Sequence, residues 1–101
     1  MKKRIEHRHN CEGSISCRYF IKGETFNGRM LNFSKSGMYF ESGECIREGE
    51  TIYFRLISSS SLPSAREFFD GLRSESLAEV KWCREIKNED AAYFGYGVKY
   101  Y

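Results

Sequence analysis

Two arginines near the start of the chain, Arg4 and Arg8, are the residues best suited to chemistry with an anionic ligand. They stand four positions apart in a basic segment that also contains Lys3, His7 and His9. Arginine presents a planar fork of donors that matches phosphate oxygens and base edges, and its plane stacks on base faces. The spacing alone is a weak signal, because paired arginines are also common in solvated basic segments.

A second candidate is the sequence Asn-Phe-Ser-Lys-Ser-Gly at residues 32–37. It is predicted to be a tight turn between two strands, since Asn and Ser cap their own backbone. Asn32 and Ser34 offer short hydrogen-bonding side chains there, and Gly37 permits the backbone geometry that keeps the turn open. Turn chemistry alone accounts for the same residues, so this motif is also weak by itself.

Together, and in this order, the RxxxR element of residues 4–8 and the [D/N]xSxxG element of residues 32–37 resemble the PilZ family. Members of that family bind cyclic di-GMP through these two motifs. The resemblance extends to residues 80–82 and 96–100, which look like the closing strands of the PilZ barrel.

The resemblance implies a ligand site with a role for each motif residue. Arg4 and Arg8 would contact guanine and phosphate, Asn32 and Ser34 would hydrogen-bond a guanine, and Gly37 would shape the loop. Lys3 and Lys35 are additional candidates that add positive charge, although Lys35 is also expected simply to be solvated. The ligand is cyclic di-GMP, and no cofactor or metal is expected.

The composition predicts one globular domain without bulk affinity for nucleic acid. The 101 residues are 41% hydrophobic and 16% aromatic, enough for one modest core. The formal net charge is only +2, which argues against a protein that binds long nucleic acid through its overall positive charge. No apolar run is long enough to span a bilayer and no signal peptide is evident, so we expect a cytoplasmic protein without membrane insertion.

Period-two alternation predicts a series of short strands. The segments that show it are 14–21, 25–31, 38–40, 51–57, 74–86 and 93–101. In the fifth, Ala78, Val80 and Trp82 are expected on one face, with Trp82 a core or rim aromatic and not a stacking surface for a base. Strands at this spacing predict a mainly all-β fold, an antiparallel barrel or sandwich. The resemblance implies a small antiparallel barrel of the PilZ type with six to seven strands.

The segment 58–72 interrupts this pattern. Pro63 near its start and Gly71 after Asp70 fit one short helix within residues 63–70, although a loop fits nearly as well. PilZ domains commonly continue from the last strand into a helix. We expect that this helix is absent, or that this segment or a partner chain replaces it. We divide the chain into a flexible basic arm, 1–10, and a barrel domain, 11–101.

Neither the cysteines nor the histidines indicate catalysis. Cys11, Cys17, Cys45 and Cys83 lack metal-ligand spacing and are expected to be small buried hydrophobes. His7 and His9 lie in the arm, where no rigid scaffold orients them. We therefore expect a binding module and not an enzyme.

The functional expectation is a cyclic di-GMP receptor that orders its arm on binding and signals to a downstream protein partner. Two alternatives remain open. One is a degenerate PilZ-like module that makes protein contacts without the nucleotide. The other is a small β-barrel that binds single-stranded nucleic acid through its aromatic residues, for which the basic residues are concentrated too strongly in one arm.

Overall fold

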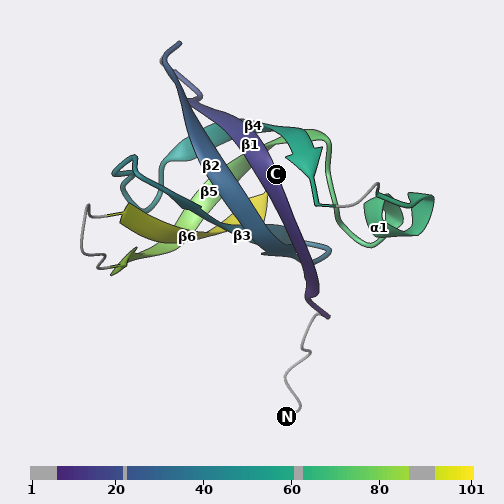
Figure 1. Cartoon of the computed structure of the whole chain (residues 1–101). Coiled ribbons are helices and arrows are strands. Elements are labelled where there is room, and N and C mark those ends of the chain that lie inside the picture. Colours follow the sequence, from purple (N-terminus) through teal and green to yellow (C-terminus); the bar gives the residue numbers. More distant parts are fainter. Residues whose placement is uncertain (1–6, 22, 61–62, 87–92) are drawn as a thin grey trace.

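Six antiparallel strands form a closed barrel in the computed structural model (Figure 1), which describes residues 7–21, 23–60, 63–86 and 93–101. Around the barrel the strands follow the order β1-β2-β3-β6-β5-β4. Their bounds are β1 His9–Tyr19, β2 Thr25–Phe33, β3 Gly37–Ser42, β4 Thr51–Ser59, β5 Glu75–Ile86 and β6 Tyr93–Tyr100. Closure of the sheet leaves no unpaired edge strand. The prediction of a mainly β, six- to seven-stranded barrel is confirmed.

Alternating side chains of all six strands fill the barrel. On β1, Ile15 and Cys17 are each only 1% exposed, while Arg18, the next residue along the strand, faces solvent. The same alternation buries Ile52 and Phe54 on β4, as the sequence predicts. It ends earlier than predicted on β1, where the strand stops at Tyr19 and Ile21 is 91% exposed.

β-Bulges shift the register where the alternation was expected to continue. One lies between Val80 and Trp82 on β5, so the two residues do not share a face. Val80 is buried in the core, whereas Trp82 is 41% exposed on the outside of the barrel. The expectation that Trp82 joins Ala78 and Val80 on one face is therefore wrong, and Trp82 is a rim aromatic.

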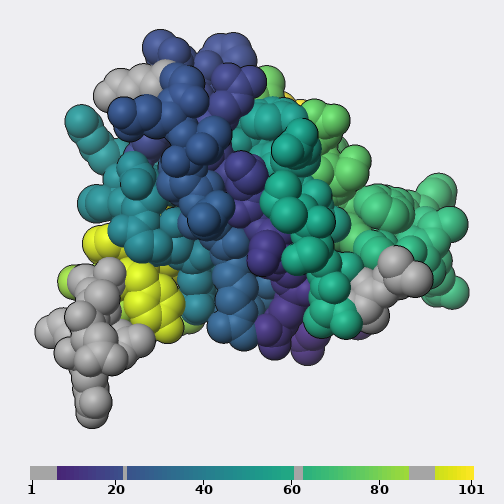
Figure 2. Space-filling view, turned by 45° about the horizontal axis from the view of Figure 1, so that its top comes forward, coloured from purple at the N-terminus to yellow at the C-terminus, as the bar shows by residue number. Residues whose placement is uncertain are grey.

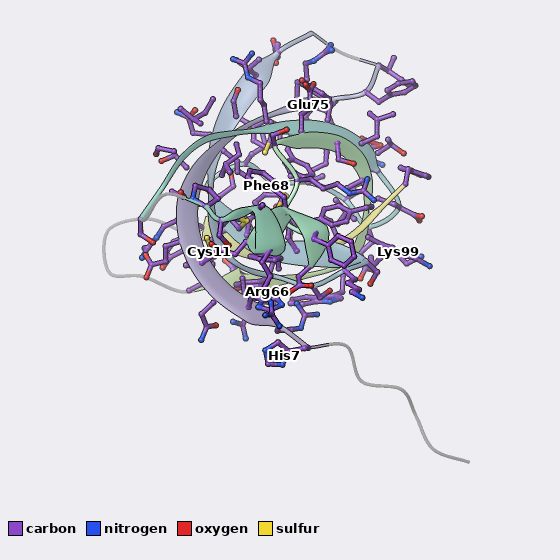
Figure 3. The ribbon with its side chains drawn as sticks, turned by 90° about the vertical axis from the view of Figure 1, so that its right-hand side faces the viewer. His7, Cys11, Arg66, Phe68, Glu75 and Lys99 are labelled. Atoms are coloured by element: carbon purple, nitrogen blue, oxygen red, sulfur yellow. The ribbon has the colours of Figure 1, made fainter. Side chains whose placement is uncertain are left out.

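One short helix, α1 (Ala65–Phe69), lies between β4 and β5, within the range predicted for it. Ser64 forms a capping box with Glu67: its hydroxyl accepts from the Glu67 N–H, and the Glu67 carboxylate accepts from the Ser64 N–H. Seen along the barrel, α1 covers one open end (Figure 3). Leu72, just after the helix, is 2% exposed and belongs to the core. The insertion thus closes an end of the barrel.

Three further expectations need correction. β1 begins at His9, so the last two residues assigned to the arm, His9 and Asn10, pair within the sheet. Asn32 is the penultimate residue of β2, and the turn is confined to residues 34–36. Of the four free thiols, Cys11 and Cys17 are buried, but Cys45 and Cys83 are exposed. No helix among the described residues is long and apolar enough to cross a membrane.

Candidate functional site

The two sequence motifs meet at one end of β2. The Arg8 guanidinium donates a hydrogen bond to Asn32 Oδ1, with Nη1 and Oδ1 2.9 Å apart. The pairing of β1 with β2 makes this possible, because it ends with Asn10 opposite Asn32 and His9 opposite Phe33, which leaves Arg8 one residue beyond the end of the paired strands. The structure therefore brings one arginine of the RxxxR element to the first residue of the [D/N]xSxxG element. Arg4 and Lys3 lie outside the described residues.

The turn of the second motif is held by its backbone. The Ser34 N–H donates to the Gly37 carbonyl at 2.8 Å, and the Tyr100 N–H donates to the Ser36 carbonyl at 2.7 Å. Ser34 is only 4% exposed, whereas Lys35 at the tip of the turn faces solvent. Asn32 is half-buried, so of the two predicted hydrogen-bonding side chains, Asn32 and Ser34, a ligand reaches Asn32 more directly.

Gly37 is required for a different reason from the one predicted. It does not have a positive φ. A Cβ atom at this position would lie 3.0 Å from the Val98 carbonyl carbon and closer still to its oxygen. Since Gly37 starts β3 and pairs with Lys99 on β6, the missing side chain permits close approach of these two strands. The glycine shapes the site through strand packing and not through turn flexibility.

An aromatic row continues from Asn32 across the outer face of the barrel. In register, Asn32 pairs with Tyr39 on β3, Tyr39 with Gly97 on β6, and Gly97 with Trp82 on β5. Residues directly opposite one another in a sheet point to the same face. Trp82 therefore lies over Gly97, and its ring stacks on that of Tyr39 with centroids 5.6 Å apart and planes 22° from parallel.

Polar contacts fix the position of Tyr39 in this row. Its hydroxyl accepts a hydrogen bond from Arg84 at 3.1 Å and donates one to Glu41 at 3.0 Å. Burial raises the pKa of Tyr39, the bond from Arg84 opposes the rise, and the bond to Glu41 adds to it. The phenol therefore stays neutral near pH 7, and the ring is a fixed support for Trp82.

An open hollow of about 430 Å³ adjoins the Arg8–Asn32 contact. It is lined by Asn10, Cys11, Glu12, Leu31, Asn32 and Ser60. A second hollow of about 490 Å³ lies between the β1–β2 and β3–β4 connections, and is lined by residues such as Phe20 and Arg47. The second hollow contains none of the predicted site residues. The arrangement around Asn32 offers a guanidinium fork, a side-chain amide and a nearby exposed indole.

Trp82 is the residue of this region whose place the sequence did not reveal. The alternation of β5 assigns it to the core side, and the bulge that reverses its direction has no clear sequence signal. The one available clue is Gly97, since a strand glycine often marks close approach of another group. Among the described residues there is no cluster of three side chains suited to a metal ion.

The family comparison agrees with this geometry. The sequence model of the PilZ domain matches residues 2–101, essentially the whole chain. The chain therefore belongs to the PilZ domain family. A search of curated proteins finds no match to it.

Proposed function

We propose that this PilZ domain is a receptor for cyclic di-GMP and has no catalytic role. The observation that carries the proposal is the Arg8–Asn32 hydrogen bond, because it joins the two motifs that the family uses for this ligand. Cyclic di-GMP carries two phosphates and two guanines. Arg8 supplies a fork for phosphate or for the O6/N7 edge of guanine, and Asn32 supplies both a donor and an acceptor.

Trp82 extends the proposed site beyond the two motifs. Its ring is 41% exposed and is held parallel to Tyr39, so one face of the aromatic row remains open on the side of the barrel that carries Asn32. Base–aromatic stacking contributes roughly 1–3 kcal/mol per base. We assign Trp82 the role of a stacking surface for a guanine, with Arg4 and Lys3 adding charge from the arm.

Ligand binding would order the arm and create a surface for a downstream protein. Arg8 is the last arm residue before β1 and already contacts Asn32, so a ligand between them would draw residues 2–7 onto the barrel. Equal amide-exchange rates at residues 2–10 with and without the ligand would exclude this step. The same proposal places the protein in the cytoplasm, a reducing compartment where exposed thiols such as Cys45 and Cys83 remain free.

Calorimetric titration of the full chain with cyclic di-GMP tests the proposal. Replacement of Arg8 by alanine should weaken binding roughly 10- to 100-fold, because such arginine contacts contribute about 1–3 kcal/mol. Arg55→Ala is the matched control, since Arg55 is an exposed arginine on β4 that pairs with Ser16, away from the motifs. Equal affinities of the two variants would contradict the site, and absence of binding by the unaltered chain would contradict the function.

The observation that favours a second function is the exposed aromatic row, which also suits single-stranded nucleic acid. Titration with homopolymeric oligonucleotides separates the two. Oligonucleotide binding at the affinity of cyclic di-GMP or tighter would favour the nucleic-acid reading.

A further inference from the structure

We propose that α1 is a cover over Ser34 that must loosen before cyclic di-GMP engages the turn, so that the stability of α1 sets the affinity of the site. This inference rests on the proposed function and adds a regulatory element that lies outside both motifs. It follows from how α1 meets the motif residues, from how weakly α1 is held, and from the link between the two.

Gly71 follows the C-cap residue of α1, Asp70, and packs against the backbone of the turn formed by residues 34–36. A Cβ atom on Gly71 would lie 2.6 Å from the Ser34 carbonyl carbon and 2.7 Å from Lys35 Cα. Gly71 also has φ of +121°, a conformation that other residues rarely adopt. Both the close approach and the positive φ therefore require glycine at position 71. Gly71 packs against the Ser34 carbonyl, and Ser34 is only 4% exposed, so we infer that a ligand contacts Ser34 fully only after Gly71 moves away.

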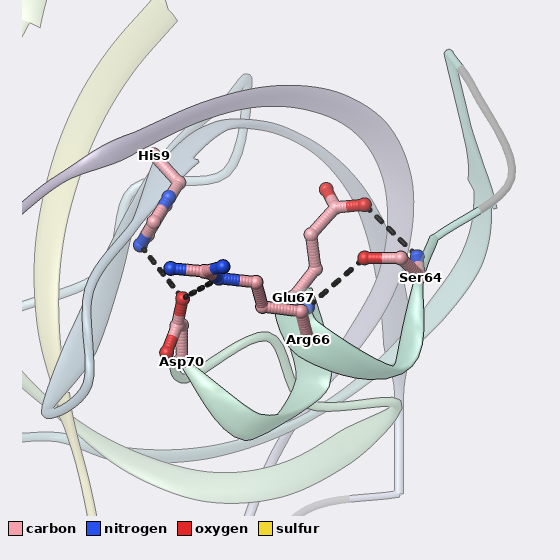
Figure 4. A network of polar contacts seen from close by, with 5 residues as sticks. All are labelled: His9, Ser64, Arg66, Glu67 and Asp70. Atoms are coloured by element: carbon pink, nitrogen blue, oxygen red, sulfur yellow. Dashed lines mark hydrogen bonds and ion pairs between the residues drawn. The ribbon is translucent and has the colours of Figure 1, made fainter.

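A second contact links the C-terminal end of α1 to the residue that follows the other motif. Asp70 caps the helix, and its Oδ2 lies 3.7 Å from both His9 Nε2 and Arg66 Nε (Figure 4). His9 immediately follows Arg8 and stacks on Phe33, with ring centroids 5.0 Å apart. A movement of α1 would therefore reach the residues beside both Arg8 and Ser34.

α1 is itself weakly anchored. It has one turn and no buried residue, and it protrudes from one end of the barrel (Figure 2). Phe68 and Phe69 are 43% and 81% exposed, so the helix contributes little to the core. Segments with few buried apolar contacts open locally at a small cost in free energy. Leu72 is anchored in the core, which allows the helix to loosen while the start of β5 stays in place.

The helix bonds that hold Gly71 also depend on the N-terminal cap. The Leu72 N–H donates to the Glu67 carbonyl at 2.9 Å, and this bond fixes Gly71 between the two residues. Glu67 is the residue whose N–H and carboxylate form the capping box with Ser64. In a single-turn helix these bonds form and break together. Weakening the box therefore frees Gly71 from Ser34 without a change to any residue of the two motifs.

Three variants of the full chain test the cover by calorimetric titration with cyclic di-GMP. Ser64→Ala removes the cap and should tighten binding by up to about fivefold, since less free energy is spent on opening. Phe69→Ala places a better helix former at an exposed position and should weaken binding about twofold. Ser64→Thr retains a capping hydroxyl and should bind within about twofold of the unaltered chain.

Amide exchange supplies an independent readout. Exchange at residues 67–72 should become faster when cyclic di-GMP is bound, because the ligand selects the open form. Weaker or unchanged binding by Ser64→Ala, or slower exchange in α1 with the ligand, would overturn the cover. If the unaltered chain binds and α1 does not respond, this inference alone fails. If the unaltered chain does not bind, the proposed function fails as well.

Discussion

Replacing Gly37 with alanine should destabilise the barrel at the point where β3 leaves the turn formed by residues 34–36. The added methyl group would lie 3.0 Å from the Val98 carbonyl carbon, 3.3 Å from Lys99 Cα and closer still to the Val98 oxygen. All three atoms are backbone, so no side-chain rotation relieves the contact. The strands must separate, and the overpacking costs roughly 1–3 kcal/mol with about 1 kcal/mol more for each ladder bond lost. We expect a loss of about 2–4 kcal/mol in the free energy of unfolding.

Urea and thermal unfolding measure this loss. For a domain of this size each 1 kcal/mol lowers Tm by roughly 4–8 °C, so the melting temperature should fall by at least about 8 °C. Gly43→Ala is the matched control, because no atom lies within 4 Å of a Cβ added there. It should change stability by less than about 0.5 kcal/mol. If the two variants melted at the same temperature, strand packing would not be the reason for glycine at position 37.

Three further outcomes are expected. Trp82→Ala should weaken cyclic di-GMP binding roughly 5- to 150-fold in calorimetry, the effect of one lost base stack. Tyr101→Ala removes an exposed aromatic residue outside the row and should leave binding unchanged. Equal losses of affinity in the two variants would contradict a stacking role. Burial raises the pKa of Tyr100 to about 12 from 10.0, so its contribution to folding is complete below pH 10 and is lost as the pH rises towards 12. The Tyr100 hydroxyl has no hydrogen-bond partner among the described residues. In urea unfolding, Tyr100→Phe should therefore match the stability of the unaltered protein at pH 7 and exceed it at pH 11. A parallel decline in the stability of both proteins between these pH values would contradict this. An aromatic disulfide reagent should label the exposed Cys45 and Cys83 quickly, and the buried Cys11 and Cys17 only on unfolding. Burial also raises the pKa of Cys17 to about 12, which keeps it in the unreactive thiol form. Rapid labelling of Cys17 would show that the core opens.

The barrel was largely predictable because its strands carry local signals. Alternation on β4 and β6 identifies the inward residues, as at Ile52 and Phe54. The α1 helix was predictable as one of two options, since Pro63 and Gly71 flank it but a loop fits the same pattern nearly as well, and its Ser64 cap is seen only in the structure. These features depend on neighbours in the sequence, and the sequence displays them.

Features set by neighbours across strands were not predictable in the same way. The bulge after Val80 turns Trp82 outward, and only the register of β5 against β6 reveals this. Likewise, Gly37 and Gly71 are fixed by backbone atoms of Val98 and Ser34, which are distant in the chain. Turn chemistry suggests conformational freedom at Gly37, whereas tertiary contact is the actual constraint.

The sequence predicted which residues belong to the candidate site better than how these residues are arranged. The motifs pointed to Arg8 and Asn32, and the structure brings these two together. The sequence did not indicate that Ser34 lies beneath Gly71. That burial arises from the β4–β5 insertion folding back over the turn, a long-range packing event.

Amide chemical-shift mapping of the full chain, titrated with cyclic di-GMP, shows directly whether the ligand binds at Arg8 and Asn32. We expect saturable shifts at Arg8, Asn32 and the Trp82 indole N–H. We expect none at Phe20, Arg47 or the other residues of the hollow between the β1–β2 and β3–β4 connections. Shifts concentrated in that hollow, or none at millimolar ligand, would contradict a cyclic di-GMP site built on Arg8 and Asn32.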